Sequence, residues 1–334
     1  MELIEQIKEQ VFGPFSGDGF NRLALRIFQY QYFNNPLYHE FARLNHRDPE
    51  HVKSLEHIPF LPVSFFRSHR VITGSQADTG QGVQFVSSGT TGSTPSVHYV
   101  LEPALYIESV MRGFKRVFGS PEEYHIFALL PSYLERGNAS LVYMADQLIK
   151  ASGSQTGGFY HTDYAALKKD LLRVADSDRK SILIGVTFAL LEFAAILDHP
   201  MPDLLIVETG GMKGRGREMI REELHQHLSQ GYGVEQVCSE YGMTELCSQA
   251  WSLGEGRYHP PPWMRVMIRD INDPYRIVGP EERGAVNIID LANLHSCAFL
   301  ATDDLGISYP DGSFEILGRI DGSQIRGCNL MMSL

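Results

Sequence analysis

Short apolar runs alternate with helical stretches between residues 125 and 238, and this alternation constrains the fold more than any other feature of the chain. Apolar runs of about five residues, such as His125–Leu130 and Leu204–Glu208, are separated by amphipathic stretches of about twelve. Buried strands that alternate with helices form βαβ units around a parallel sheet. The sequence therefore predicts an α/β fold with mostly parallel sheets wrapped by helices, and ligands are expected beyond the carboxyl ends of the strands.

The same reasoning gives the expected elements of this core. The predicted strands are Val83–Val86, His125–Leu130, Gly157–His161, Ser181–Val186, Leu204–Glu208 and Val234–Cys238, and the predicted helices are Glu102–Phe118, Ala139–Ala151, Tyr164–Ala175, Phe188–Leu197 and Arg215–Ser229.

The regions on either side of this core have different patterns. Residues 1–58 predict amphipathic helices, whereas two prolines predict an extended segment over Ile58–Phe66. From about residue 255, short strand candidates separated by turns predict an antiparallel β subdomain. Its expected strands are Val266–Ile268, Arg276–Val278, Ala285–Ile289, Phe299–Ala301, Gly306–Tyr309 and Ser313–Leu317. We therefore divide one continuous unit into a helical region with the proline segment (1–84), an α/β core (85–254) and a β-rich subdomain with a tail (255–334).

Composition excludes several kinds of partner. The 40 acidic and 29 basic side chains give a formal net charge of −11, which argues against nucleic acid or an anionic membrane as the main partner. No apolar run approaches the roughly 18 residues of a transmembrane helix.

The N-terminus and the cysteines indicate the compartment. The first ten residues lack the apolar core of a signal peptide, so a cytoplasmic protein is expected. The four cysteines form no C-x-x-C pair, and a disulfide framework is not expected.

Eight consecutive residues, Ser87 to Thr94, are only Ser, Gly or Thr, and Pro95 follows them. Glycines that adopt positive φ let backbone N–H groups converge on an anion, and the hydroxyls add further donors. This composition suits a phosphate-binding loop, although a flexible surface loop has the same composition. No lysine follows Gly92, so an ordinary P-loop is disfavoured. The candidate phosphate ligands are Ser87, Ser88, Gly89, Thr90, Thr91 and Gly92.

Two further stretches follow predicted strands. The first, E-T-G-G-M-K-G-R-G from Glu208, contains Gly210 and Gly211, which permit close backbone approach to a flat or anionic ligand. The second, S-E-Y-G-M-T-E from Ser239, places an aromatic ring, a hydroxyl and a carboxylate within five residues, a set that can flank a base, touch phosphate and hold Mg²⁺. A plain strand-to-helix turn and a tight turn with a capping Thr are the alternatives.

Near the C-terminus, T-D-D-L-G places Asp303 and Asp304 in an expected turn, and G-R-I-D contains Arg319. A carboxylate accepts well from two neighbouring ribose hydroxyls, and an arginine can reach phosphate or ribose. Cys328 follows Arg326, a cation that would favour its thiolate. An Asp-rich β-turn and an inert tail cysteine are the alternatives.

In this order, the Ser/Gly/Thr run, the Gly-Gly turn, Y-G-M-T-E, T-D-D-L-G and G-R-I-D resemble the adenylate-forming superfamily of acyl-CoA synthetases, peptide-synthetase adenylation domains and luciferases. The resemblance covers the chain from about residue 85 to its end, and Y-G-M-T-E is its most specific motif. Within that superfamily, P-F-L-P-V-S-F-F, P-S-Y-L-E-R-G-N-A-S-L-V and the ending R-G-C-N-L look like the LuxE-type acyl-protein synthetases.

The resemblance implies a fold, an activity and roles for single residues. It implies the large domain of adenylate-forming enzymes, with residues 85–254 as its nucleotide-binding core, and activation of a fatty acid by ATP and Mg²⁺. The acyl group would then pass to Cys328 as a thioester and on to a LuxC-like acyl reductase. By resemblance, Ser87 to Thr94 would hold the phosphates, Gly210 and Gly211 would border the adenine, and Tyr241 would lie against its ring, with Gly242 also among the nucleotide-binding residues. Thr244 would contact phosphate and Glu245 would bind Mg²⁺. Asp304 would hold the ribose hydroxyls, and Arg319 would assist.

Three positions depart from the superfamily pattern. Ser96 and Val97 follow Pro95 where a lysine is usual, and Asp303 stands where glycine is usual. The chain also ends where most members begin a small C-terminal lid domain with a second lysine, which LuxE-type proteins lack too. Another cation must therefore offset the phosphate charge, with Lys213, Arg215 or Arg326 as candidates.

Two other functions fit the same residues. An acyl-CoA ligase resembling phenylacetate-CoA ligases would use coenzyme A as the acceptor and make Cys328 irrelevant, and a catalytically inactive nucleotide- or acyl-binding protein would account for the missing loop lysine. The sequence does not specify the chain length of the acid, the final acceptor, the oligomeric state or the pathway.

Overall fold

The computed structural model describes residues 3–74, 82–87, 94–131, 138–210 and 219–320. The chain forms two compact units, which are treated separately below. The first comprises residues 1–109, 245–248 and 259–334, and the second comprises residues 110–244 and 249–258. The division into 1–84, 85–254 and 255–334 stays a prediction. No helix among the described residues is both long and apolar enough to cross a bilayer.

The second unit is built on a sheet with the strand order β5-β4-β6-β7-β8-β9. All neighbouring pairs from β5 to β8 are parallel, and only β9 is antiparallel to β8. This confirms the predicted α/β core with a mostly parallel sheet. The strands are β4 (Tyr124–Leu129), β5 (Gly158–Tyr160), β6 (Lys180–Gly185), β7 (Leu204–Glu208), β8 (Cys238–Tyr241) and β9 (Ala250–Ser252), with the short β10 (Arg257–Tyr258) near β8 and β9.

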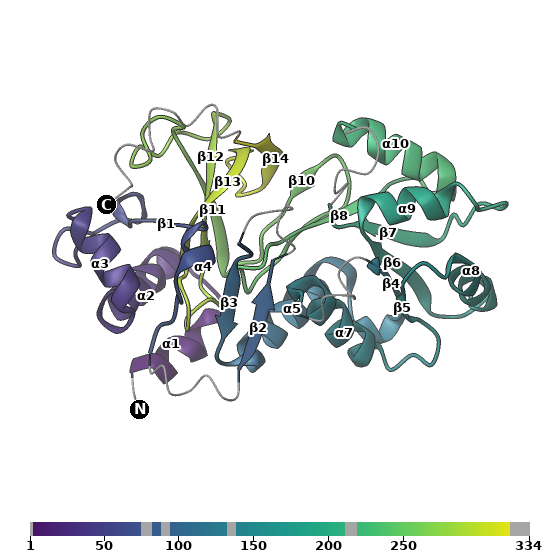
Figure 1. The fold of residues 1–334 in the computed structure, drawn as a ribbon, viewed down its shortest axis with the longest axis horizontal. Coiled ribbons are helices and arrows are strands. Elements are labelled where there is room, and N and C mark those ends of the chain that lie inside the picture. Colours follow the sequence, from purple (N-terminus) through teal and green to yellow (C-terminus); the bar gives the residue numbers. More distant parts are fainter. Residues whose placement is uncertain (1–2, 75–81, 88–93, 132–137, 211–218, 321–334) are drawn as a thin grey trace. The chain divides into compact units, whose positions relative to one another are not determined.

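Helices connect these strands as expected for βαβ units (Figure 1). They are α7 (Ser140–Ser152), α8 (Tyr164–Arg173), α9 (Thr187–Ala194) and α10 (Arg221–Tyr232), and a short η3 (Pro121–Glu123) precedes β4. Every residue of β4 is buried, and Leu183, Ile206 and Phe193 belong to the same fully buried cluster. Strands with both faces covered have no polar side to alternate with, which is why they occur as continuous apolar runs in the sequence.

The first unit contains an antiparallel sheet in which β14, β13, β12 and β11 are neighbours in that order, with β1 added in parallel to β13. This is the predicted β subdomain. Its strands are β1 (Leu61–Pro62), β11 (Met264–Arg269), β12 (Arg283–Asp290), β13 (Phe299–Ser308) and β14 (Phe314–Arg319). No separate lid domain occurs among the described residues of either unit.

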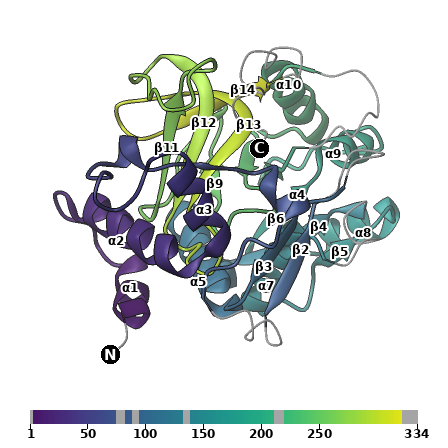
Figure 2. The ribbon, with the colours of Figure 1, turned by 60° about the vertical axis from the view of Figure 1, so that its left-hand side comes forward.

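Helices from the N-terminal region pack together in the first unit (Figure 2). They are α1 (Leu3–Val11), α2 (Gly19–Asn34), α3 (Pro36–Leu44), η1 (Leu55–His57) and α4 (Phe65–Ser68). The break between α2 and α3 has a local cause, because the Asn35 side chain accepts a hydrogen bond from Tyr38 N (3.0 Å) and Pro36 opens the next helix. Buried Gln31 then joins α2 to the β12–β13 connection through Asn293 O and Ala298 N.

Helix α5 (Pro103–Phe118) contains the boundary between the units, and the hairpin β2 (Val83–Val86) and β3 (Val97–Val100) precedes it in the first unit. The sequence predicts β2 and α5 but not β3.

The extended segment predicted over Ile58–Phe66 ends too late, because Phe65–Ser68 forms helix α4. A proline restricts its own backbone and that of the residue before it, so Pro59 and Pro62 leave the residues after Val63 free to form a helix.

Three other predicted elements differ from the structure. Strand β8 begins at Cys238 and ends at Tyr241, so the expected strand Val234–Cys238 lies too early. Helix α10 begins at Arg221; of the expected helix Arg215–Ser229, residues 215–218 lie outside the described residues and residues 219–220 are not helical. Arg276–Val278 forms only an isolated bridge from Ile277 to Arg269. Each error lies at an element end or in a short apolar run, where local pattern is weakest.

The largest correction concerns Asp303 and Asp304. The predicted strands Phe299–Ala301 and Gly306–Tyr309 are not separate, because one continuous strand, β13, extends from Phe299 to Ser308. The two aspartates therefore lie within a strand and not in a turn. The residues expected to break the strand instead sit where its register against β12 shifts.

Asp290, at the end of β12, is a fully buried acceptor that organises the chain around it. Its carboxylate accepts from Cys247 N (2.8 Å), Ser248 N (3.0 Å) and Ser248 Oγ (2.6 Å), and from Ala292 N (3.2 Å). Burial raises the pKa of Asp290, and these hydrogen bonds oppose that rise. Since Cys247 and Ser248 lie outside any helix or strand, Asp290 is what fixes their backbone to the sheet.

Two glutamates lie at the carboxyl ends of adjacent parallel strands in the second unit. Glu208 ends β7 opposite Ser239, and Glu240 follows Ser239 on β8. Burial, with the negative charge of Glu208 as a second cause, raises the pKa of Glu240 to about 8. Burial also raises the pKa of Glu208, against hydrogen bonds that lower it. The pair therefore favours the protonated form of Glu240 near neutral pH.

We expect Asp290→Asn to lower the free energy of unfolding by about 3 kcal/mol or more, because an NH₂ group would face buried donors that need an acceptor. Urea denaturation measures this loss. Asp270→Asn is the matched control, since Asp270 also accepts from two backbone N–H groups but is more exposed. A loss for Asp290→Asn no larger than that of the control would contradict this role.

We also expect the free energy of unfolding to fall as the pH rises from about 4.5 to about 8. In this window the folded chain keeps a proton on Glu240 that the unfolded chain releases, so the unfolded state binds fewer protons. Urea midpoints at about pH 5.5 and about pH 8.5 test this, and Glu240→Gln should flatten the difference. Exposed Glu235→Gln is the control and should behave as the wild type. A wild-type midpoint that rises with pH, or an unchanged slope in Glu240→Gln, would reject the assignment.

Candidate functional site

The structure describes about half of the residues that the sequence singles out. Those described in the first unit are Ser87, Glu245, Asp304 and Arg319, and those in the second unit are Gly210, Tyr241, Gly242 and Thr244. Ser88, Gly89, Thr90, Thr91, Gly92, Gly211 and Cys328 lie outside the described residues, as do Lys213, Arg215 and Arg326. The Y-G-M-T-E segment itself crosses the boundary, between Thr244 and Glu245.

The Ser/Gly/Thr run connects the two strands of the β2–β3 hairpin. Its two ends are held together because Ser87 N donates to Ser96 O (3.0 Å) and Ser96 N donates to Ser87 Oγ (2.8 Å). The Ser87 oxygen therefore acts as an acceptor that closes the base of the loop.

Glu245 is nearly fully buried in the first unit, with 7% of its surface exposed. Burial raises the pKa of its carboxyl group, whereas a hydrogen bond from Ser96 and the charges of Arg67 and Arg319 lower it. Ser96 is thus shared: its backbone closes the loop and its side chain reaches Glu245. The predicted metal ligand and the predicted phosphate loop are joined by a single serine that the sequence did not single out.

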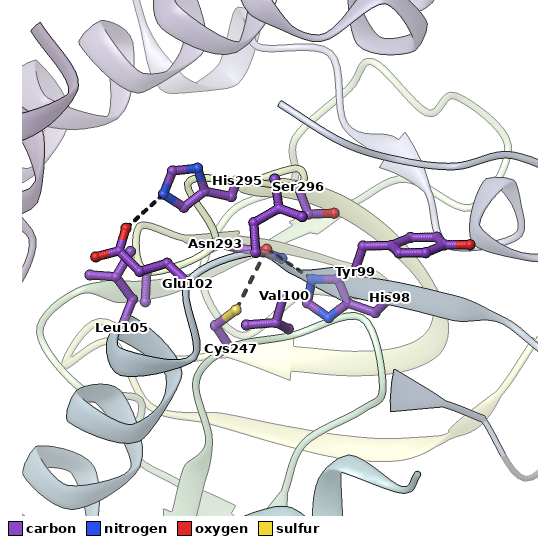
Figure 3. Close-up of a pocket in the computed structure, with 11 residues that line it drawn as sticks. His98, Tyr99, Val100, Glu102, Leu105, Cys247, Asn293, His295 and Ser296 are labelled. Carbon is purple, nitrogen blue, oxygen red and sulfur yellow. Dashed lines mark hydrogen bonds and ion pairs between the residues drawn. The ribbon is translucent and has the colours of Figure 1, made fainter. Parts of the chain in front are cut away.

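Asn293 holds the backbone of Glu245 in place. Its Nδ2 donates to Glu245 O (2.8 Å), so its Oδ1 must face the other side, where it accepts from His98 Nε2 (3.2 Å) and Cys247 Sγ (3.6 Å). Figure 3 shows Asn293, His98 and Cys247 together in the lining of a small pocket. His98 belongs to β3, so Asn293 links the loop hairpin to the segment that contains Glu245.

That pocket is too small for a substrate. It has about 10 Å³ of free space, which corresponds to roughly one water molecule. Cys247, which lines it, is not a nucleophile, because burial and the nearby charge of Asp290 raise the pKa of its thiol well above the usual value. The pocket is therefore a hydrogen-bond junction that supports Glu245.

Asp304 and Arg319 face each other across β13 and β14. The Asp304 side chain is 10% exposed, and Arg319 Nε lies 3.4 Å from its Oδ1 with a side chain that is 79% exposed. The structure thus brings together the two residues predicted to bind ribose. Asp303, the residue that departs from the superfamily pattern, is exposed on the neighbouring position.

In the second unit, Glu208 shapes the glycine turn that follows β7. Gly210 has φ +76° and its N–H donates to Glu208 Oε1 (2.7 Å), which also accepts from Thr187 Oγ1. The positive φ explains why glycine stands here. The Glu208 side chain therefore stabilises the turn by accepting these two hydrogen bonds, a role that the E-T-G-G sequence does not indicate.

Tyr241 ends β8 and is buried beside Tyr258, with ring centroids 5.7 Å apart. The Arg221 guanidinium lies 5.3 Å from the centre of the Tyr258 ring. Gly242 follows, and a Cβ there would lie 2.3 Å from Glu240 Oε1, so a larger residue would displace the Glu240 carboxyl group. Thr244 is half-buried.

Sequence reasoning missed Ser96, Asn293, His98 and Asp290. None belongs to a recognisable motif, and their roles arise from contacts with residues distant in the chain. Among the described residues, no group of three or more His, Cys, Asp or Glu side chains could hold a metal ion alone.

Solved structures resemble this fold. A 2-hydroxyisobutyryl-CoA ligase in complex with 2-HIB-AMP and CoA has a TM-score of 0.63 and 14% identity over 90% of this chain and 70% of that one. A luciferase-like enzyme from the nonluminescent mealworm Zophobas morio has a TM-score of 0.52 and 16% identity over 75% and 60%. An ATP-bound RpMatB–BxBclM chimera has a TM-score of 0.51 and 17% identity over 71% of this chain, which spans only 47% of that protein.

These likenesses establish the fold of adenylate-forming, acyl-CoA synthetase-like enzymes. No curated protein matches the chain by sequence. A family profile does match, described as "Acyl-protein synthetase, LuxE" and covering residues 17–334. Because the match spans nearly the whole sequence and agrees with the fold, the chain belongs to the LuxE acyl-protein synthetase family.

Proposed function

We propose that this protein activates a fatty acid with ATP to an acyl-adenylate, transfers the acyl group to its own Cys328, and delivers it to an acyl reductase partner. The observation that supports this most directly is the buried Glu245, which belongs to Y-G-M-T-E and receives a hydrogen bond from the base of the Ser/Gly/Thr loop. A carboxylate beside a phosphate-binding loop is what a magnesium nucleotide needs.

In the first step a carboxylate oxygen of the acid attacks the α-phosphorus of ATP. A new P–O bond forms, the bond from the α-phosphorus to the bridging oxygen breaks, and pyrophosphate leaves with the electron pair. Positioning and charge neutralisation supply most of such a rate enhancement. Asp304 would accept from the ribose hydroxyls, with Arg319 beside it, and Tyr241, Gly242 and Gly210 would border the adenine.

Glu245 fits Mg²⁺ chemically. It is a buried carboxylate, a hard oxygen donor, with only partial compensation from Ser96, Arg67 and Arg319. When bound, Mg²⁺ would stabilise negative charge on the phosphate oxygens. Thr244 would contact the same phosphate.

The cations that replace the missing loop lysine are also part of this proposal. Arg67 and Arg319 are close enough to Glu245 for their charges to lower its pKa. Arginine stays protonated at every physiological pH and can neutralise phosphate without titrating. We therefore assign the charge-neutralising role to Arg67 and Arg319, beside the sequence candidates Lys213, Arg215 and Arg326.

In the second step the Cys328 thiolate attacks the acyl carbonyl carbon. A C–S bond forms, the C–O bond to the phosphate breaks, and AMP leaves with the electron pair. The other three cysteines are unsuited, because burial raises the pKa of Cys238 to about 11, that of Cys297 to about 12, and that of Cys247 still more clearly. All three are buried, so acyl transfer to them is unfavourable.

A second candidate function is an acyl-CoA ligase. It is favoured by one observation, the similarity in fold to a 2-hydroxyisobutyryl-CoA ligase whose structure contains CoA. In that case coenzyme A would accept the acyl group and Cys328 would remain unmodified.

We expect Glu245→Gln to reduce fatty-acid-dependent ATP–pyrophosphate exchange by about a hundredfold or more, since the charge that holds Mg²⁺ is lost while the shape is kept. Exposed Glu50→Gln is the control and should exchange as the wild type does. Exchange by Glu245→Gln at near the wild-type rate, in a folded protein, would remove Glu245 as the metal ligand.

We expect intact mass spectrometry after incubation with MgATP and saturated fatty acids, without coenzyme A, to reveal a covalent acyl adduct on Cys328. Cys328→Ser should lose this hydroxylamine-sensitive adduct and keep pyrophosphate exchange, because adenylate formation does not use the thiol. Cys238→Ala should keep both. An adduct that persists in Cys328→Ser would reject the acceptor. Release of AMP only after coenzyme A is added would favour the acyl-CoA ligase.

A further inference from the structure

β13 contains a bulge at the residues proposed to meet the ribose. Its register against β12 pairs Ala301 with Asn287 and Leu305 with Ala285. Thr302, Asp303 and Asp304 therefore all lie opposite Val286 alone. Regular antiparallel strands pair one residue with one residue, so this bulge interrupts the regular β12–β13 ladder at Val286. Buried backbone carbonyls need another donor.

Arg269 supplies that donor from two strands away. Its Nη1 donates to Val286 O (2.8 Å) and to Asn287 Oδ1 (2.6 Å), and its Nη2 donates to Thr302 O (2.8 Å). Arg269 belongs to β11 and pairs there with Ala285 of β12, so its side chain extends across β12 to reach β13. The guanidinium group thus holds both sides of the bulge at once.

Thr302 extends this arrangement to Asp304. Its hydroxyl donates to Val286 O (3.0 Å), the carbonyl that Arg269 also holds, and accepts from Asp304 N (3.1 Å). The backbone nitrogen of Asp304 is therefore connected to the guanidinium group through one side chain and one carbonyl. These are buried or partly buried bonds, so they are strong enough to fix the backbone of Asp304.

Gly306 completes the bulge on its other side. A Cβ at this position would lie 2.5 Å from Glu315 O of β14 and 2.9 Å from Val286 Cγ2. Only glycine lets β14 and Val286 approach so closely. The bulge is thus specified by two side chains, those of Arg269 and Thr302, and by the glycine at position 306. As a result, the Asp304 carboxylate lies beside Arg319, whereas Asp303 is exposed.

We propose that Arg269 is a positioning residue that sets the Asp304 carboxylate for ribose, and that it thereby determines the preference of this enzyme for ribonucleotides over 2′-deoxyribonucleotides. The inference rests on the proposed role of Asp304 as the acceptor of the ribose hydroxyls. A carboxylate accepts two vicinal hydroxyls only if both of its oxygens face them, so a small rotation of the Asp304 backbone would lose one bond.

The test compares the affinities for MgATP and Mg-2′-deoxyATP by calorimetric titration, without a fatty acid. We expect the wild type to prefer ATP by about tenfold or more, the usual strength of a hydrogen bond to a carboxylate. Arg269→Lys should reduce that preference by at least about threefold, because an ammonium group cannot form the three-bond fork. Affinity for 2′-deoxyATP should change little, and this distinguishes lost positioning from general damage.

The matched control is Arg265→Lys. Arg265 lies on the same strand and is also partly buried, but its contacts are Asn21 Oδ1 (2.7 Å) and the Phe20 ring (4.1 Å to the centroid), not the bulge. It should keep the wild-type preference. Thr302→Val is a second variant that removes the link to Asp304 N and retains Arg269, and it should reduce the preference in the same way. It keeps the test open if Arg269→Lys does not fold.

The outcomes separate this inference from the function on which it rests. Absence of ATP binding in the wild type, or a preference for ATP that survives in Asp304→Asn, overturns the proposed ribose site and the inference with it. A preference that Asp304→Asn abolishes but that both Arg269→Lys and Thr302→Val keep overturns the inference alone. Equal losses in Arg269→Lys and Arg265→Lys would also overturn it, because they would reflect the strand and not the bulge.

Discussion

A single buried carboxylate, Asp290, fixes the part of the first unit on which the candidate chemistry depends. The segment from Glu245 to Ser248 has no helix or strand of its own, and its backbone donors need acceptors. Asp290 provides them through Cys247 N and Ser248 N. Without this acceptor the backbone N–H groups of Cys247 and Ser248 would be buried without these bonds. The conformation of the segment, and with it the position of the Glu245 carboxylate, would be less well defined.

Asn293 acts on the same segment from the opposite side. The Asn293 side-chain amide donates a hydrogen bond from its nitrogen to the Glu245 carbonyl and accepts one at its oxygen from the His98 ring. Asn293 therefore holds both Glu245 and the β2–β3 hairpin, to which His98 belongs. The buried position of these groups makes each bond costly to lose. Asp290 is the last residue of β12 and Asn293 follows it by three residues, so the end of this one strand positions the backbone of Glu245.

The sequence predicts the architecture well because the architecture depends on periodicity. Continuous apolar runs identify β4, β6 and β7, and the short strand candidate Val266–Ile268 identifies the middle of β11. It misplaces Asp303 and Asp304 because acidic pairs are typical of turns, whereas Arg269 stabilises a bulge within β13. An arginine 35 residues or so distant gives no local signal. The roles of Ser96, Asn293 and Asp290 could not be predicted for the same reason, because they depend on contacts with residues distant in the sequence.

Charge is the last constraint that the site must satisfy. The described residues assigned to nucleotide binding in the first unit include two buried carboxylates, Glu245 and Asp304, and ATP adds further negative charge. Repulsion between these groups would oppose binding unless cations lie among them. Arg319 pairs with Asp304, and Arg67 acts on Glu245 together with Arg319. A divalent ion at Glu245 would supply the remaining positive charge. A chain without the usual loop lysine can therefore still be organised for a magnesium nucleotide, provided that arginines and a metal ion supply the positive charge of that lysine.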